Sequence, residues 1–207
     1  MWIVWDWNGT LLDDVDACVE SLNDLLSRRS LPVLDRGFFR RRFAFPARRF
    51  YEEIGMDVPD SEWDALAKEY HDAYRSKPLN VNPLAREALE KARAAGARQA
   101  ILSALRSDFL ADDLDRFGLA GYFDAVAGSD NLDGGSKTDA AVRLARRLAG
   151  DAMAVIGDSL HDREAADAMG AKFVGFGGGS HSPERLRHAG PVADTLPEAV
   201  SIALRMA

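Results

Sequence analysis

The chain has 207 residues, of which 47% are hydrophobic and 29% are charged. These values suit one globular domain, or a domain core with one insertion, and exclude a disordered chain, a collagen repeat and a small disulfide-stapled scaffold. No apolar run approaches the roughly 18 residues that a membrane helix needs, and residues 1–10 lack the features of an export signal. Cys18 is the sole cysteine, so no intrachain disulfide can form, and we expect a cytoplasmic protein with no membrane partner.

The net charge of −7 argues against general attraction to nucleic acid. Residues 28–49 nevertheless hold eight arginines and one aspartate, a local charge of +7 that leaves −14 on the rest of the chain. These arginines could form the solvated faces of helices that bury the neighbouring phenylalanines. Alternatively, one or two of Arg42, Arg48 and Arg49 could hold an anionic ligand, and Arg49 is our candidate for ligand binding.

The first predicted element is a buried strand at residues 2–5. The next segment, residues 14–79, has helical patterns at 15–26, 38–43, 47–54 and 62–74 but no convincing strand. We therefore expect an inserted all-helical cap there, with a return linker at residues 80–82 between Pro78 and Pro83.

Strand and helix patterns alternate through the rest of the chain. Helices are predicted at 83–95, 108–117, 138–149 and 161–169, each followed by a glycine, and strands at 99–102, 125–127, 153–156 and 173–174. This alternation predicts an α/β fold with a doubly wound, Rossmann-like parallel sheet. The predicted core is residues 1–13 and 80–207, and the predicted cap is residues 14–79.

Three of the predicted strands end in residues that can carry chemistry. Asp6, Ser103 and Asp158 each follow a buried strand, and Lys137 opens the helix that follows the strand predicted at residues 125–127. Because the carboxyl ends of parallel strands lie on one edge of a sheet, these side chains are expected to meet there. Taken singly, each has a plainer explanation: Asp158 and Asp162 could cap a helix, Ser103 could satisfy backbone groups, and Lys137 could be an ordinary exposed lysine.

The order of these residues resembles the four motifs of the haloacid dehalogenase-like superfamily of phosphohydrolases. The first motif corresponds to the run Asp6-Trp7-Asn8-Gly9-Thr10. The second corresponds to Ser103, the third to Lys137, and the fourth to Gly157-Asp158 with Asp162. The cap position between the first and second motifs, and the tail that runs from Val174 to Gly190, resemble the phosphoglycolate phosphatase-like branch.

The resemblance implies a Mg²⁺-dependent phosphatase that acts on a small phosphorylated metabolite. Asp6 would be the nucleophile that forms an aspartyl-phosphate, and Lys137 would neutralise the developing charge. Ser103 and the amide of Ala104 would bind the phosphoryl oxygens, while Gly9 would allow the backbone to approach closely. The implied metal ligands are Asp6, the main-chain carbonyl of Asn8 and Asp158, with Asp162 binding more indirectly or holding Lys137.

Asn8 departs from the family pattern, which places a general acid and base aspartate at this position. An amide cannot exchange protons usefully near neutral pH, and general acid–base help is typically worth about 10²–10⁴-fold. We therefore expect slowed hydrolysis, least affected for leaving groups that need no proton, and we expect Asn8→Asp to raise turnover of alkyl phosphates. The alternative is a catalytically impaired protein that binds a phosphorylated ligand or regulates another process.

Other readings are open or weaker. A dehalogenase would leave the paired acids of the fourth motif idle. A phosphonate-cleaving enzyme would need a lysine in the cap, but no lysine precedes Lys68. A nucleic-acid-binding module would need base-reading motifs, which the chain lacks. Trp5 and Trp7 should pack on the side opposite Asp6. His161 is expected only to begin a helix, and the sequence leaves the physiological substrate and the oligomeric state open.

Overall fold

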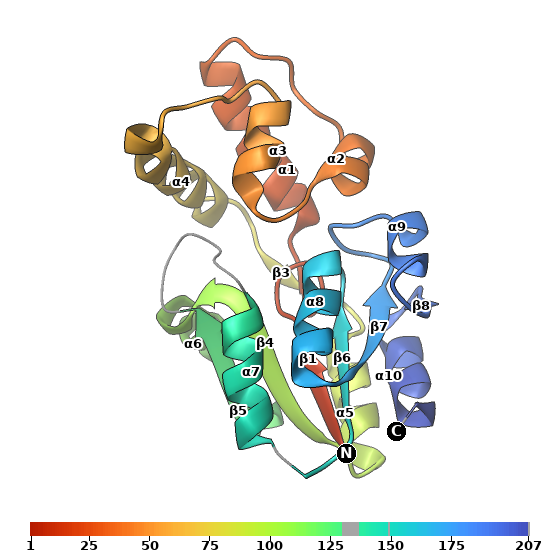
Figure 1. Ribbon diagram of the computed structural model, residues 1–207. Helices are drawn as coiled ribbons and strands as arrows, with labels where there is room; N and C mark the ends of the chain where they lie inside the picture. Colours follow the sequence, from red (N-terminus) through yellow and green to blue (C-terminus); the bar gives the residue numbers. More distant parts are fainter. Residues whose placement is uncertain (130–136, 149, 207) are drawn as a thin grey trace.

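The computed structural model describes residues 1–129, 137–148 and 150–206. Its main element is a six-stranded parallel sheet in the order β5-β4-β1-β6-β7-β8 (Figure 1). From β1 the chain adds β4 and then β5 on one side, and afterwards β6, β7 and β8 on the other side. This strand order is that of a doubly wound fold and confirms the predicted class. The strands are β1 (Trp2–Trp5), β4 (Arg98–Arg106), β5 (Ala125–Ser129), β6 (Met153–Gly157), β7 (Lys172–Phe176) and β8 (Val192–Ala193).

Helices cover both faces of this sheet. One face packs against α5 (Ala85–Ala94), α6 (Ser107–Arg116) and α10 (Leu196–Arg205). The other packs against α7 (Lys137–Arg147), α8 (Leu160–Met169) and α9 (Pro183–Arg187). Alternation along β1 divides its side chains between the two layers: Ile3 and Trp5 join the first, Trp2 and Val4 the second.

Trp5 and Trp7 are packing residues, as expected. Both are fully buried in the hydrophobic layer beside α5 and α6. The indole N–H of Trp5 donates to Gln99 Oε1 at 2.9 Å, and that of Trp7 donates to Asp113 Oδ2 at 3.4 Å. These two buried indole rings, whose N–H groups are hydrogen-bonded, therefore anchor the loop after β1 in this hydrophobic layer.

The observed elements differ from the predicted ones mainly at their ends. Strand β4 continues past residue 102 to Arg106, with a register shift against β5 between Leu102 and Arg106. Helix α7 begins at Lys137, and its predicted end at Ala149 lies outside the described residues. The short strand β8 and the helices α9 and α10 were not predicted.

A two-stranded antiparallel ribbon marks both ends of the insertion. It pairs β2 (Leu12–Asp13) with β3 (Asn80–Val81), and the Asn82 N–H donates to the Leu11 carbonyl at 2.8 Å. Neither strand was predicted, because two residues are too few to produce a period-2 pattern. The ribbon brings the two chain crossings together beside the loop that follows β1.

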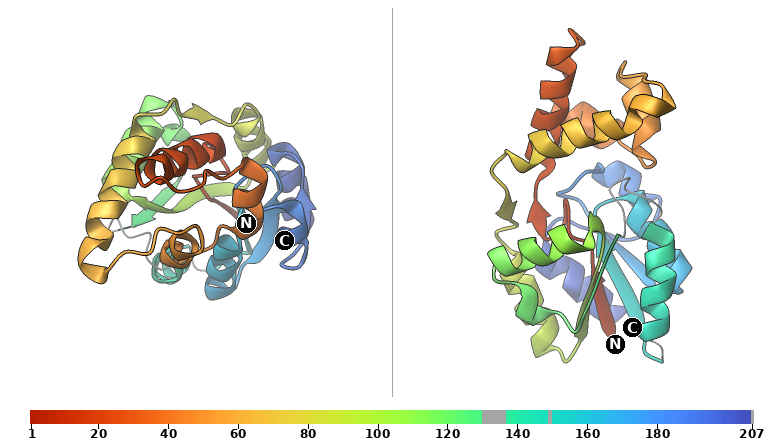
Figure 2. Two further views of the ribbon diagram at one scale, coloured as in Figure 1. Left: turned by 90° about the horizontal axis from the view of Figure 1, so that it is seen from above. Right: turned by 90° about the vertical axis from the view of Figure 1, so that its left-hand side faces the viewer.

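Four helices lie between β2 and β3 and form a separate layer beyond the carboxyl ends of the sheet strands (Figures 1 and 2). Their apolar faces make their own hydrophobic cluster, which contains Leu22, Phe39, Phe50 and Leu66. These helices form the helical insertion: α1 (Val15–Arg28), α2 (Arg36–Arg42), α3 (Ala47–Glu53) and α4 (Asp60–Arg75). Across the described residues, no helix is both long enough and apolar enough to cross a membrane.

Candidate active site

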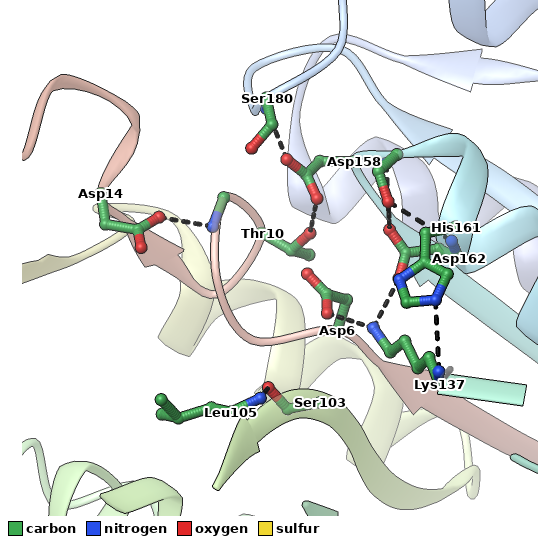
Figure 3. A network of polar contacts seen from close by, with 12 residues as sticks. Asp6, Thr10, Asp14, Ser103, Leu105, Lys137, Asp158, His161, Asp162 and Ser180 are labelled. Atoms are coloured by element: carbon green, nitrogen blue, oxygen red, sulfur yellow. Dashed lines mark hydrogen bonds and ion pairs between the residues drawn. The ribbon is translucent and has the colours of Figure 1, made fainter. Parts of the chain in front are cut away.

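Three aspartates converge at the carboxyl edge of the sheet. Asp6 follows β1, Asp158 follows β6, and Asp162 lies in the first turn of α8 (Figure 3). All three are at most 6% exposed, and each offers an oxygen within 4.8 Å of those of the other two. Adjacent parallel strands thus bring together residues more than 150 positions apart in the chain, as the sequence predicted.

Lys137 reaches this cluster from the beginning of α7. Its ammonium group contacts Asp6 and lies 2.5 Å from Asp162 Oδ1, and its side chain is 3% exposed. Burial disfavours the ammonium ion, but the two carboxylates outweigh that effect and raise the pKa of Lys137. The lysine is therefore a permanently charged part of the site, not an ordinary surface lysine.

Asp162 has two structural connections. Its Oδ2 accepts hydrogen bonds from Ser159 N at 3.0 Å and Ser159 Oγ at 2.7 Å, which completes a capping box at the start of α8. Its Oδ1 faces Lys137. Although burial acts in the opposite direction, Lys137 and Ser159 lower the pKa of Asp162. The helix-cap and active-site readings of this residue are thus compatible.

Asp158 faces the loop that carries the first motif. Thr10 Oγ1 donates to Asp158 Oδ1 at 3.5 Å, and the Ser180 N–H donates to Oδ2. Gly9 has φ +74°, and a Cβ at this position would lie 2.1 Å from Asp158 Oδ2. Only glycine therefore permits this turn and this approach of the backbone to the carboxylate.

Ser103 and Ala104 line the same pocket as Asp6 and Lys137. Ser103 is 2% exposed, and its Oγ accepts a hydrogen bond from Leu105 N at 3.0 Å. That bond occupies the oxygen as an acceptor and leaves the hydroxyl proton available for donation into the pocket. Both residues lie where the pairing of β4 with β5 changes register.

The amide of Asn8 contacts two residues of the helical insertion. Asn8 Nδ2 lies 2.7 Å from Asp14 Oδ2 and 3.0 Å from the Tyr74 hydroxyl. The Tyr74 hydroxyl donates to Asp14 Oδ2 at 2.5 Å, and the Gly9 N–H donates to Asp14 Oδ1 at 2.6 Å. Burial raises the pKa of Asp14, whereas these hydrogen bonds oppose the rise. Neither Asp14 nor Tyr74 was predicted as a site residue, since nothing in their local sequence pattern marks this contact.

Two histidines lie beside the cluster in uncharged form. His161 Nε2 accepts a hydrogen bond from the Lys137 backbone N–H at 3.2 Å, and the ring packs 4.7 Å from that of Phe45. Burial and the nearby Lys137 lower the pKa of His161 to about 4. His161 does begin a helix, as expected, but it also positions the backbone at the start of α7.

His181 provides a test of this buried environment. Its Nδ1 accepts the Leu160 N–H at 3.1 Å, its Nε2 is buried without a hydrogen-bond partner among the described residues, and burial lowers its pKa to about 4. The unfolded chain binds more protons between pH 6.5 and 4, so stability must fall as the pH drops through that window. We expect a loss on the order of 3 kcal/mol at pH 4 from this residue.

Urea denaturation of native protein and His181→Asn between pH 7 and 4 measures this loss. Asparagine retains an acceptor for the Leu160 N–H but does not titrate. The native protein should lose more stability than the variant on acidification, whereas parallel curves would contradict the assignment.

None of the eight arginines of residues 28–49 lines the pocket. Arg49 is exposed, and it is not among the described pocket-lining residues, so it does not reach the site in this conformation. Arg42 pairs with Glu53 at 2.5 Å, and Arg48 pairs with Asp60 at 2.6 Å. Arg40, which was not singled out, instead donates to the backbone of the loop after β7, including the Gly179 carbonyl at 2.8 Å.

The three aspartates fit a hard divalent cation. When ionised they carry more negative charge than Lys137 neutralises, and they offer only oxygen donors. Burial and the neighbouring aspartates raise the pKa of Asp158 well above its ordinary value, and burial with repulsion from Asp162 raises that of Asp6. A cation would reverse this penalty by stabilising the ionised forms.

This fold and this site match a known group of enzymes. The model of the haloacid dehalogenase-like hydrolase family matches residues 3–176, and the chain belongs to that family. It is similar to a probable phosphatase, IndB, from Dickeya dadantii, with 28% identity over 212 residues that cover 97% of this chain and 92% of the relative. A phosphoglycolate phosphatase from Mesorhizobium japonicum is 30% identical over 190 residues, covering 83% and 80%. Together, the family and these relatives make the chain a phosphatase, as the motifs predicted.

Solved structures agree on the fold. The crystal structure of a predicted phosphatase from Clostridium acetobutylicum superposes with a TM-score of 0.81 over 99% of this chain and 98% of that chain. The two sequences are 22% identical. A haloacid dehalogenase-like protein from Agrobacterium tumefaciens has a TM-score of 0.78 at 23% identity, over 99% and 98%. The similarity includes the helical insertion, because it covers nearly the whole of each chain.

Proposed function

We propose that this phosphatase hydrolyses small phosphate monoesters through an aspartyl-phosphate on Asp6. The observation that supports this most is the pocket shared by the Asp6 carboxylate, the Lys137 ammonium group and Ser103. A carboxylate approaches a phosphate dianion only where positive charge and hydrogen-bond donors offset the repulsion. Lys137 supplies the charge, while Ser103 and the amide of Ala104 supply the donors.

The proposed cofactor is Mg²⁺, held by Asp6, the main-chain carbonyl of Asn8 and Asp158. Asp162 acts more indirectly, since its oxygens contact Lys137 and Ser159. When bound, the ion contributes positive charge next to the phosphoryl oxygens. Gly9 keeps the first-motif loop close enough to Asp158 for both to face one cation.

We propose that residues 14–79 act as a cap over the core formed by residues 1–13 and 80–207. The β2–β3 ribbon is the hinge, because both crossings between the two parts pass through it. Contacts from Arg40 to the loop after β7 hold α2 near the site. Closure would exclude water during phosphoryl transfer, and opening would release the product. The single cysteine of the chain is consistent with a cytoplasmic location.

Asn8 limits the reaction at the step in which a departing alcohol needs a proton. Its amide also donates to Asp14, so it is already occupied. The proposed enzyme is therefore slow on alkyl esters. The alternative, a protein that binds a phosphorylated ligand without turnover, rests on this same substitution.

The experiment measures phosphate release from a panel of phosphorylated metabolites, with Mg²⁺ or with EDTA. Native protein should release phosphate only with Mg²⁺, and acid-quenched samples should carry one phosphoryl group on the peptide that contains Asp6. Asp6→Asn should abolish both signals, because an amide is not a nucleophile at phosphorus. Asp13→Asn is the matched control, since Asp13 is exposed in the same segment.

Phosphate release that persists in EDTA, or in Asp6→Asn, would contradict the proposal. Ligand binding without any release by the native protein would support the non-catalytic alternative.

A further inference from the structure

The part of the pocket that faces the phosphoryl site is aromatic. The pocket has a volume of about 200 Å³ and extends from Asp6 into the helical insertion. Among the lining residues that the structure describes, the insertion contributes no lysine or arginine. It contributes seven uncharged phenylalanine, tyrosine and tryptophan side chains, namely Phe39, Phe43, Phe45, Tyr51, Trp63, Tyr70 and Tyr74.

Phe45 is the most informative of these side chains. It is 37% exposed although it is a large apolar group, and its ring packs 5.2 Å from Phe43 and 4.7 Å from His161. The uncharged Phe45 ring therefore lies against His161, which accepts a hydrogen bond from the backbone N–H of Lys137.

The arginines near the pocket that could bind a substrate carboxylate already have partners within the protein. Arg42 and Arg48 are paired with acids of the insertion, and Arg40 binds backbone carbonyls of the core. In the core part of the pocket, Nε and Nη2 of Arg106 each donate to the Asp108 carboxylate at 2.6 Å. The described lining thus offers apolar area to the leaving group and no unpaired arginine to an anion.

Asn8 restricts the leaving group independently of the aromatic lining. The Asn8 amide cannot transfer a proton to the leaving group near neutral pH. The adjacent Asp14 carboxylate does not take over this role, because both of its oxygens already accept hydrogen bonds from Gly9, Asn8 and Tyr74. A phenol has a pKa of about 10, and that of an alkyl alcohol is near the value of about 16 for water. A phenolate can therefore depart without protonation far more readily than an alkoxide.

We propose that the preferred substrates are aryl phosphate monoesters, whose uncharged single-ring leaving group packs against the aromatic side chains of the insertion. This inference rests on the function proposed above and specifies its substrate class. A cavity of about 150 Å³ is enough to hold benzene, so the pocket has room for one ring. The same lining disfavours a short carboxylated ester such as phosphoglycolate.

The reaction balances without a proton donor. An oxygen of Asp6 forms a bond to phosphorus while the bond from phosphorus to the aryl oxygen breaks, and the electron pair leaves with the phenolate. Water then attacks the phosphorus, the bond to Asp6 breaks, and the proton of the water passes to solvent. The net products are the phenolate, inorganic phosphate and one proton.

Four substrates separate the two causes of this selectivity. Phenyl phosphate has a ring and a leaving group of low pKa, whereas benzyl phosphate has the ring and an alkyl oxygen. Acetyl phosphate has a good leaving group and no ring, and phosphoglycolate has neither feature. We expect kcat/KM for phenyl phosphate to exceed that for phosphoglycolate by about 100-fold, with a low KM for both ring-containing esters and a high kcat for phenyl and acetyl phosphate.

Phe45→Ala tests the aromatic contact, and exposure of this ring makes misfolding a small concern. The variant should raise KM about 10-fold more for phenyl and benzyl phosphate than for acetyl phosphate, which has no ring. Phe38→Ala is the matched control, because Phe38 lies in the same insertion but lines a different cavity. Circular dichroism of both variants verifies folding.

Efficient turnover of phosphoglycolate relative to phenyl phosphate would overturn the substrate class, as would an equal rise in KM for all four esters in Phe45→Ala. The absence of Mg²⁺-dependent release from every ester, acetyl phosphate included, would instead contradict the proposed function itself.

Discussion

Lys137→Met is expected to lower the free energy of unfolding of the metal-free protein by about 3–5 kcal/mol. The ammonium group is the buried partner of both Asp6 and Asp162, whose side chains are 8% and 2% exposed. Methionine preserves the length of the side chain but leaves two carboxylates close together without their cation. Turnover should fall about 10²–10³-fold as well, since the proposed mechanism loses the positive charge beside the transferred phosphoryl group.

Urea denaturation in EDTA measures the first effect, and a Mg²⁺ titration extends it. Added Mg²⁺ should stabilise the variant more than the native protein, because the ion replaces charge that the variant lacks. Lys68→Met is the matched control: Lys68 pairs with Asp72 at 2.6 Å, but its side chain is 74% exposed, so its loss should leave stability nearly unchanged. Equal stability of native protein and Lys137→Met in EDTA would refute the buried ion cluster.

We expect Asn8→Asp to raise turnover by less than a general acid at this position of the motif would. A second substitution, Asp14→Asn, should restore the full increase in turnover. The new carboxylate would replace the amide nitrogen that lies 2.7 Å from Asp14 Oδ2, so two carboxylates would meet in a partly buried position. The single variant should therefore lose about 1–3 kcal/mol of stability. Exchanging the two groups in Asn8→Asp/Asp14→Asn restores one carboxylate and one amide, with the Tyr74 hydroxyl able to donate as before.

Turnover of benzyl phosphate by the two variants measures this coupling. The double variant should exceed the native protein by about 10²–10⁴-fold, the usual worth of a general acid, and the single variant should fall between them. Asp14→Asn alone should not raise turnover. Additive effects of the two substitutions on stability would show that positions 8 and 14 do not interact.

The fold and the central residues of the site were predictable because they follow local rules. Apolar runs bounded by polar residues marked the central strands, and the carboxyl ends of parallel strands must share an edge. Asp6 and Asp158 were predicted to meet for that reason alone, and the structure places them together. Lys137 could be added because a helix that follows a strand of a parallel sheet begins at the same edge.

Other features depend on how the insertion packs on the core, which no local pattern encodes. Asp14 and Tyr74 are 60 residues apart, yet both contact the Asn8 amide. Arg49 had the right charge to bind a ligand, but its place on α3 leaves it exposed. No local pattern distinguishes Phe45 from the other phenylalanines of the insertion, but the structure places its ring beside that of His161.

The sequence by itself determined the doubly wound core and the identity of the charged groups at its edge, because hydrophobic period and strand order leave few other arrangements. Only the tertiary structure decided which side chains of the insertion line the pocket around Asp6. Those contacts depend on the docking of four helices through a short ribbon, and the direction in which each side chain points is set by packing between distant segments. The aromatic lining, and with it the expected choice of substrate, therefore belongs to the assembled molecule.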